Sequence, residues 1–284
     1  MTNSLATGIG TLYIVATPIG NREDITFRAI EVLKSVDFIL AEDTRHSIQL
    51  LSSLGIKNNL ESLHAHNEND KSKHIIEQLL SGKSIALISD AGTPLISDPG
   101  YLLVKLARQH QVPVIPIPGA CALVTALCAA GIPTDSFLFL GFLPAKQQAR
   151  KSKLESLRSE PHTLIFYEST HRILNCIEDI GAIFGIECEV VLAKELTKTF
   201  ERFISGTTED VKNWLLSASA HVKGEFVLLI PPRPITPLEN DNEKLLQVLL
   251  SELPLKQAVS LACKITDGNK NELYEQALTI KNKE

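Results

Sequence analysis

Short apolar runs alternate with helix-like stretches along the first 120 residues, and this alternation strongly restricts how the chain can fold. The runs that we predict as strands are residues 11–16, 37–41, 60–64, 84–88 and 112–117. Helical patterns occupy residues 26–35, 47–54, 71–80 and 102–109, and Thr26 is a suitable cap for the first helix. Strands that alternate with helices form a mostly parallel sheet covered on both faces, so we expect an α/β domain over residues 1–122.

The middle of the chain is richer in strand patterns than the first part. We predict strands at residues 137–142, 163–167, 189–193, 202–205 and 226–230. Helical patterns lie between or before them, at residues 123–130, 147–157, 171–183 and 209–216. These strand-rich connections favour a second α/β domain of mixed topology over residues 123–232.

The composition changes near the C-terminus. Four prolines between residues 231 and 237 precede an acidic run, so residues 233–243 are predicted to form an exposed linker. Residues 244–284 are predicted to form a small helical module, with helices at 245–253, 256–266 and 271–280. The last two have the spacing of a helix-turn-helix. An ordinary helical hairpin has the same spacing, so the spacing alone does not predict nucleic-acid binding.

The overall charge argues against a general attraction to nucleic acid. The net charge is −5 and the pI is about 5.9, so any contact with RNA must come from a local basic patch. The five cysteines are odd in number and form no Cys-x-x-Cys pair, which favours free thiols in a reducing compartment. With no signal-peptide pattern and no apolar run of ~18 residues, we expect a cytoplasmic protein that does not enter a membrane.

Several predicted strands end in polar loops rich in small residues. They are residues 17–24, 41–45, 88–100 and 118–121. Ligands of open α/β sheets bind beyond the carboxyl ends of the strands, and glycine lets the backbone approach a ligand closely. We therefore expect a ligand pocket at this edge, although Asp and Pro also occur in ordinary turns.

Common nucleotide and metal motifs are missing from the sequence. Gly8-Ile-Gly10 precedes a strand and lacks the third glycine of a dinucleotide fingerprint. Gly82-Lys83-Ser84 resembles the end of a P-loop, but Glu77 stands where the first glycine is needed. His64 and His66 have no partner cluster at zinc spacing, so we expect no metal site.

Seven ordered motifs between residues 10 and 230 resemble those of the tetrapyrrole (corrin/porphyrin) methylase superfamily. The similarity is greatest to its branch of small-subunit ribosomal RNA 2′-O-ribose cytidine methyltransferases. The motifs are residues 16–21, 41–45, 89–100, 116–119, 166–172, 194–198 and 223–226. Thr170 stands where that branch usually has proline, which we expect to alter a turn and not the chemistry.

This resemblance implies two α/β domains, a homodimer, and S-adenosyl-L-methionine bound in a cleft between the domains. The residues that the resemblance places at the cofactor are Pro18, Gly92, Thr93, Ile96, Cys121, Ala122, Glu168, Leu196 and Gly224. Small residues there would let backbone groups reach the cofactor, and the apolar members would exclude water.

Methylation of a ribose hydroxyl needs accurate placement of a poor nucleophile, and a carboxylate base would help. We favour Glu195, which lies at a strand end beside Lys194 and Lys198, with Asp98 as the second candidate. Asp43 and Glu168 are further candidates. Any of these carboxylates could instead orient a loop or balance the positive sulfonium.

The RNA substrate that the resemblance implies needs lysine or arginine contacts to phosphate, on free RNA or on the ribosomal subunit. Residues 141–172 carry six basic and three acidic side chains, in an otherwise acidic chain. From this segment we select Lys146, Arg150, Lys151, Lys153 and Arg172. A solvated helix face would have a similar composition.

Two other functions remain open from the sequence. The first is a tetrapyrrole C-methyltransferase, against which residues 166–172, residues 194–198 and the C-terminal module argue. The second is a non-catalytic RNA-binding or assembly factor, against which the intact small-residue loops argue.

Overall fold

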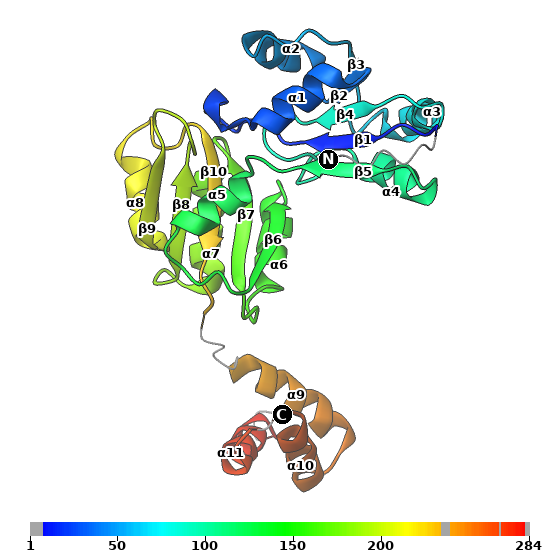
Figure 1. The fold of residues 1–284 in the computed structure, drawn as a ribbon. Coiled ribbons are helices and arrows are strands. Elements are labelled where there is room, and N and C mark those ends of the chain that lie inside the picture. Colours follow the sequence, from blue (N-terminus) through cyan, green and yellow to red (C-terminus); the bar gives the residue numbers. More distant parts are fainter. Residues whose placement is uncertain (1–7, 234–238, 267, 282–284) are drawn as a thin grey trace. The chain divides into compact units, whose positions relative to one another are not determined.

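The computed structural model describes residues 8–233, 239–266 and 268–281, and it divides into two compact units at Pro232–Arg233 (Figure 1). The larger unit contains two sheets. We call residues 8–121 the first lobe and residues 122–232 the second lobe.

The sheet of the first lobe is parallel throughout, with the strand order β3-β2-β4-β1-β5. Its strands are β1 (Leu12–Val15), β2 (Phe38–Ala41), β3 (Leu60–Ser62), β4 (Ile85–Ile88) and β5 (Val114–Ile117). Side chains alternate along each strand: Leu40 and Leu87 face helices α3 (Glu68–Leu80) and α4 (Tyr101–Gln109). Ile39 and Ala86 face α1 (Phe27–Ser35) and α2 (Thr44–Ser53).

Local capping explains where the first helices begin. Thr26 caps α1, as predicted, because its Oγ1 accepts a hydrogen bond of 3.1 Å from the Ala29 N–H. Helix α2 begins at Thr44, three residues before the predicted start. The Asp43 carboxylate caps it by accepting a 2.9 Å hydrogen bond from the Arg45 N–H.

The second lobe has a mixed sheet with the order β6-β7-β10-β8-β9. Strands β6 and β7 run parallel, and the other neighbours are antiparallel. The strands are β6 (Phe137–Phe142), β7 (Thr163–Ser169), β8 (Glu189–Lys194), β9 (Arg202–Thr207) and β10 (Glu225–Ile230).

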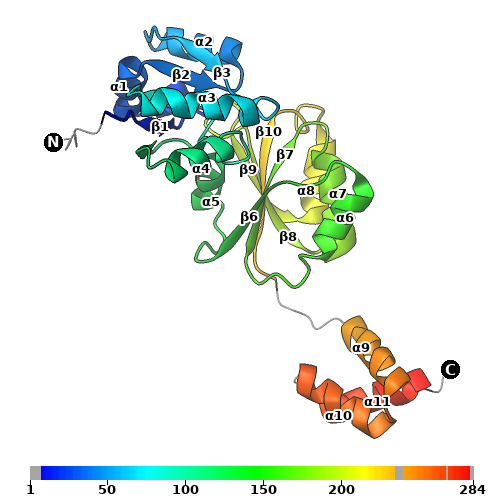
Figure 2. The same ribbon diagram turned by 90° about the vertical axis from the view of Figure 1, so that its right-hand side faces the viewer.

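Helices cover both faces of this second sheet (Figure 2). One face packs against α6 (Gln147–Glu155), α7 (Ile173–Phe184) and α8 (Thr208–Ser217). The other packs against α5 (Ala122–Ala129), where Ala126 and Leu127 contact Ile165 and Val227. The prediction of two α/β domains is therefore confirmed.

The smaller unit consists of helices α9 (Glu239–Glu252), α10 (Leu255–Thr266) and α11 (Lys270–Lys281). Its apolar centre includes Leu246, Val259 and Leu273. Helix α9 begins inside the predicted linker, because an acidic segment is also well suited to the first turn of a helix. Residues 234–238 of that linker lie outside the described residues. None of the helices in the described part of the chain is long and apolar enough to cross a bilayer.

Candidate active site

A cavity of about 530 Å³ lies between the two lobes, within the usual size range for small-molecule sites. The first lobe contributes Ile19, Glu42, residues 90–93, residues 96–98 and Cys121. The second lobe contributes Ala122, Phe142, residues 167–171, Ala193, Leu196 and residues 224–227. The loop at residues 88–100 thus forms much of one wall, at the carboxyl edge of the parallel sheet.

The backbone near Gly92 is shaped for close approach. Thr17 and Gly92 exchange two backbone hydrogen bonds of 2.9 and 3.0 Å, which join the loops after β1 and β4. Gly92 has φ +83°, and a Cβ atom added there would lie 3.3 Å from Cγ2 of Ile19. The positive φ therefore favours glycine, and any side chain would crowd Ile19. Thr93 Oγ1 donates a 3.0 Å hydrogen bond to the Ala120 carbonyl and so fixes the loop after β5.

Three carboxyl groups of the first lobe line the cavity: Glu42, Asp90 and Asp98. Burial raises the pKa of Asp98, and the neighbouring Asp90 charge raises it further. Burial also raises the pKa of Glu42, with additional effects from Asp98 and Asp90. This wall is negatively charged and suits a ligand that carries a positive group. Among the described residues, no cluster of three or more His, Cys, Asp or Glu side chains is arranged to hold a metal ion.

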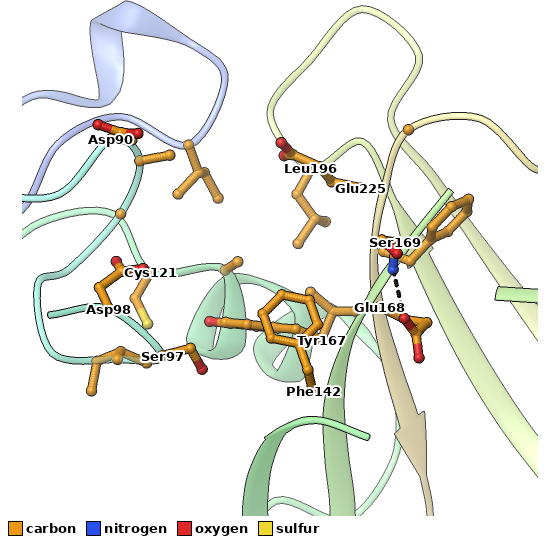
Figure 3. Close-up of a pocket in the computed structure, with 18 of the residues that line it drawn as sticks. Asp90, Ser97, Asp98, Cys121, Phe142, Tyr167, Glu168, Ser169, Leu196 and Glu225 are labelled. Carbon is orange, nitrogen blue, oxygen red and sulfur yellow. Dashed lines mark hydrogen bonds between the residues drawn. The ribbon is translucent and has the colours of Figure 1, made fainter. Parts of the chain in front are cut away.

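The opposite wall, from the second lobe, is mainly apolar and aromatic. Figure 3 shows Tyr167, Phe142 and Leu196 across the cavity from Asp90 and Asp98. The Tyr167 hydroxyl accepts a 3.0 Å hydrogen bond from the Leu123 N–H, and burial raises the pKa of this phenol, so it stays neutral. The two walls therefore differ in chemistry.

Glu168 and Arg172 form a fixed pair behind the second wall. The Glu168 side chain is fully buried, and its Oε1 lies 3.1 Å from Nε of Arg172. Arg172 also donates to the Leu143 carbonyl, and Glu168 accepts a 2.9 Å hydrogen bond from the Ser169 N–H. Arg172 thus holds Glu168 in place, and its contact with RNA stays a prediction.

Glu195, our favoured base, lies outside the lining of the cavity. Its carboxylate accepts hydrogen bonds from the Glu225 N–H at 2.9 Å and from Lys198 Nζ at 3.0 Å. Burial alone would raise the pKa of Glu195, but these hydrogen bonds and the nearby lysines lower it below its usual value. A lowered pKa weakens a carboxylate as a base, and the hydrogen bond with the Glu225 N–H holds the backbone of the Gly224–Glu225 segment.

Thr170, the departure from the branch pattern, connects β7 to the segment before β10. Its hydroxyl donates to the Gly224 carbonyl at 2.8 Å and accepts from the Gly224 N–H at 2.9 Å. The substitution therefore affects how a turn is hydrogen-bonded, and it helps to place Gly224 at the cavity.

The structure brings most of the predicted cofactor residues together around one cavity. Those that line it are Gly92, Thr93, Ile96, Cys121, Ala122, Glu168, Leu196 and Gly224, with Asp98 beside them. Pro18 is buried and does not line the cavity, whereas the next residue, Ile19, does. Asp43 is occupied as the cap of α2, and its hydrogen bonds with Arg45 lower its pKa to about 2. The sequence reasoning missed Glu42, although it lies in a motif at a strand end, and Phe142.

The predicted RNA residues separate into two groups. Lys146 and Lys153 are exposed, and Lys151 is partly exposed with its Nζ 3.6 Å from Asp179. Arg150 instead is buried: its Nε lies 2.7 Å from Asp179, and its side chain is 4% exposed. The prediction that Arg150 contacts RNA is therefore wrong, because α6 packs this residue against α7.

Comparison with known proteins identifies the family. Residues 11–212 match the family described as Tetrapyrrole (Corrin/Porphyrin) Methylases. The chain belongs to this family. Residues 236–281 match the RsmI C-terminal HTH domain, which covers the helical module.

Similar proteins extend over nearly the whole chain. A protein of Haemophilus influenzae named Ribosomal RNA small subunit methyltransferase I is 51% identical over 95% of this chain and 96% of its own length. A protein of the same name from Pseudomonas aeruginosa is 48% identical over 95% and 97%.

Solved structures share the fold of the larger unit. The uroporphyrin-III-C-methyltransferase of Thermus thermophilus has a TM-score of 0.56 at 20% identity and covers 78% of this chain and 94% of its own. A diphthine synthase has a TM-score of 0.61 at 14% identity and covers 78% and 90%. At such low identity these similarities establish the fold alone.

S-adenosyl-L-methionine is the methyl donor of this family, and the cavity fits it in three respects. Gly92 leaves room for the ligand to approach the backbone, and Leu196 and Val227 offer apolar surface to an adenine ring. The Asp90 and Asp98 carboxyls complement a sulfonium cation.

Proposed function

We propose that this protein transfers a methyl group from S-adenosyl-L-methionine to the 2′-oxygen of a cytidine ribose in small-subunit ribosomal RNA. The observation that carries the proposal is a match of about 50% identity, across both lobes and the helical module, to proteins named for that RNA. The acidic wall of the cavity suits a cationic methyl donor, and the apolar wall suits its flat groups.

We assign the role of general base to Asp98. The cofactor supplies an electrophilic methyl group on a sulfonium. The Asp98 carboxylate would accept the proton of the ribose hydroxyl as its oxygen takes up the methyl group. Asp98 lines the cavity, and its raised pKa makes it a stronger base than an ordinary aspartate. Positioning of the two reactants by the cleft would supply much of the remaining acceleration.

Exposed lysines on α6 are the best candidates for contacts to RNA phosphates. Lys146 and Lys153 retain this role, with Lys151 as a weaker contributor because Asp179 partly neutralises it. Arg150 and Arg172 instead support the fold and the cavity wall. An RNA substrate of this kind implies a cytoplasmic location.

A homodimer is part of the proposal. Phe27 is 91% exposed and Phe200 is 73% exposed, and large exposed aromatic side chains often mark protein interfaces. The segment before α1 and the loop after β8 are joined where the Asn21 N–H donates a 3.0 Å hydrogen bond to Thr197 Oγ1. Analytical ultracentrifugation of the full chain would test this assembly.

Methylation of isolated small ribosomal subunits from a strain that lacks the gene tests the proposed function. The product nucleosides would be separated and analysed by mass spectrometry. We expect one added methyl group on the ribose of a cytidine. Methyl on a base would reject the 2′-oxygen as acceptor, and no transfer to RNA would favour a tetrapyrrole acceptor or a non-catalytic role.

A further inference from the structure

Strand β6 contains a β-bulge beside the cavity. Phe139 lies opposite Ile165 of β7, whereas Phe142 lies opposite Tyr167, so three steps along β6 match two steps along β7. Gly141, within the bulge, has φ +62°, a left-handed conformation that glycine adopts without strain. Bulges of this kind commonly redirect a side chain next to an active site.

The extra residue changes the face on which Phe142 lies. Leu138 and Leu140 pack with the core on the α6–α7 face, whereas Phe139 packs on the α5 face. Regular alternation would place Phe142 with Leu138 and Leu140. The bulge instead brings it to the face of Phe139 and Tyr167, where it lines the cavity.

The Phe142 ring is supported from behind and open in front. It meets Tyr167 edge-on, with ring centroids 5.8 Å apart and an interplanar angle of 68° (Figure 3). Tyr167 is held by the Leu123 N–H and by a second edge contact with Phe139 at 4.8 Å. Phe142 is nevertheless 53% exposed, so it presents an immobilised aromatic surface to the cavity.

The bulge also approaches the loop that carries Asp98. A Cβ atom added at Gly141 would lie 3.1 Å from Oγ of Ser97 in the first lobe. Ser97 has φ +71°, and so does Leu95 two residues before it. Strained backbone of this kind persists where the surrounding structure holds it in place, often at ligand sites. The aromatic surface and the proposed base are thus placed close together in the cleft.

We propose that Phe142 is the surface on which the base of the acceptor nucleotide stacks, so that its ribose lies toward Asp98. This inference rests on the proposed function and names the part of the cavity that holds the RNA. Proteins recognise single-stranded RNA by stacking unpaired bases on exposed aromatic rings. The ligand of this subsite is an unpaired pyrimidine nucleotide within a single-stranded segment.

Three variants test the stacking surface: Phe142→Leu, Phe142→Tyr and, as a matched control, Phe137→Leu. Phe137 lies on the same strand, is 45% exposed, and is not among the residues that line the cavity. The probe is the small ribosomal subunit from a strain that lacks the gene. For Phe142→Leu we expect kcat/KM for this RNA to fall roughly 5- to 150-fold, the range for loss of one stacked base. Phe142→Tyr and Phe137→Leu should stay near the wild-type value.

Affinity for S-adenosyl-L-methionine, measured by calorimetry, must stay unchanged in Phe142→Leu. A wild-type kcat/KM in this variant would overturn the inference. A loss of cofactor affinity as large as the loss of kcat/KM would also overturn it, because the ring would then contact the cofactor. If the wild-type protein methylates no RNA, the proposed function fails separately. Equilibrium binding of a fluorescent single-stranded RNA then decides: weaker binding by Phe142→Leu supports the stacking surface, and equal binding rejects it.

Discussion

The two lobes meet the same cavity with different kinds of structure. The first lobe reaches it with loops that follow the carboxyl ends of parallel strands, and these carry Glu42, Asp90 and Asp98. The second lobe reaches it with the bulged end of β6, which carries Phe142, with parts of β7 and β10, and with the loop after β8, which carries Leu196. In the mechanism that we propose, the first wall would receive the proton and balance positive charge, and the aromatic and apolar side chains of the second wall would supply surface for flat groups.

The largest effect should follow from disrupting the second lobe behind its wall. We expect Arg150→Ala to lower the free energy of unfolding by about 3–5 kcal/mol, because it leaves Asp179 buried without its main partner. Urea denaturation measures this directly. Lys153→Ala on the same helix should change stability by less than about 0.5 kcal/mol, since the side chain is exposed. Equal stability of both variants would contradict a supporting role for the buried pair.

In the first lobe, Gly92→Val should block the cofactor. Strain at a positive φ should cost about 1–3 kcal/mol of stability, and the added side chain would fill the space in which the cofactor approaches the backbone, so affinity for S-adenosyl-L-methionine should fall roughly 100-fold or more. Calorimetry gives the affinity, and circular dichroism checks the fold. Gly131→Val is the matched control, because Gly131 also has a positive φ but has open space around it. An unchanged affinity in Gly92→Val would remove this loop from the cofactor site.

The smallest effect is expected on the outer surface of the second lobe. Lys146→Ala and Lys153→Ala should each weaken RNA binding evenly across sequences and reduce the slope of log affinity against log salt by about 1. Fluorescence anisotropy at several salt concentrations measures both quantities. Binding with the wild-type slope would show that these lysines form only a solvated helix face.

The elements of the fold were largely predictable, because apolar periodicity is a local property of the sequence. Capping determined what periodicity could not: Asp43 extends α2 beyond its apolar pattern. Side-chain burial was harder to predict, since nothing in the order Ala149-Arg150-Lys151 distinguishes the arginine that packs against Asp179 from the lysine that is partly exposed.

The residues of the cavity were also only partly predictable from the sequence. Motif residues such as Gly92 and Leu196 do line it, because the loops at strand ends meet there. The hydrogen bonds of the Glu195 carboxylate with Lys198 and the Glu225 backbone were not predictable, because backbone geometry of that kind leaves no pattern in the sequence. Phe142 had no signal either, since regular alternation places it on the opposite face of the sheet.

The most direct test of the central claim is the pH dependence of kcat/KM for methylation of small ribosomal subunits by the wild type and Asp98→Asn. A base must be deprotonated, so wild-type activity should rise as pH increases through the pKa of Asp98, which lies above the ordinary value for aspartate. At saturating cofactor, Asp98→Asn should lose this rise and about 10²–10⁴-fold of the rate. Glu195 is not among the lining residues, and Glu195→Gln, which weakens its hydrogen bond with the Glu225 N–H, should lose less than about tenfold. A wild-type rate and pH profile in Asp98→Asn would contradict the account that the acidic wall of the first lobe receives the proton.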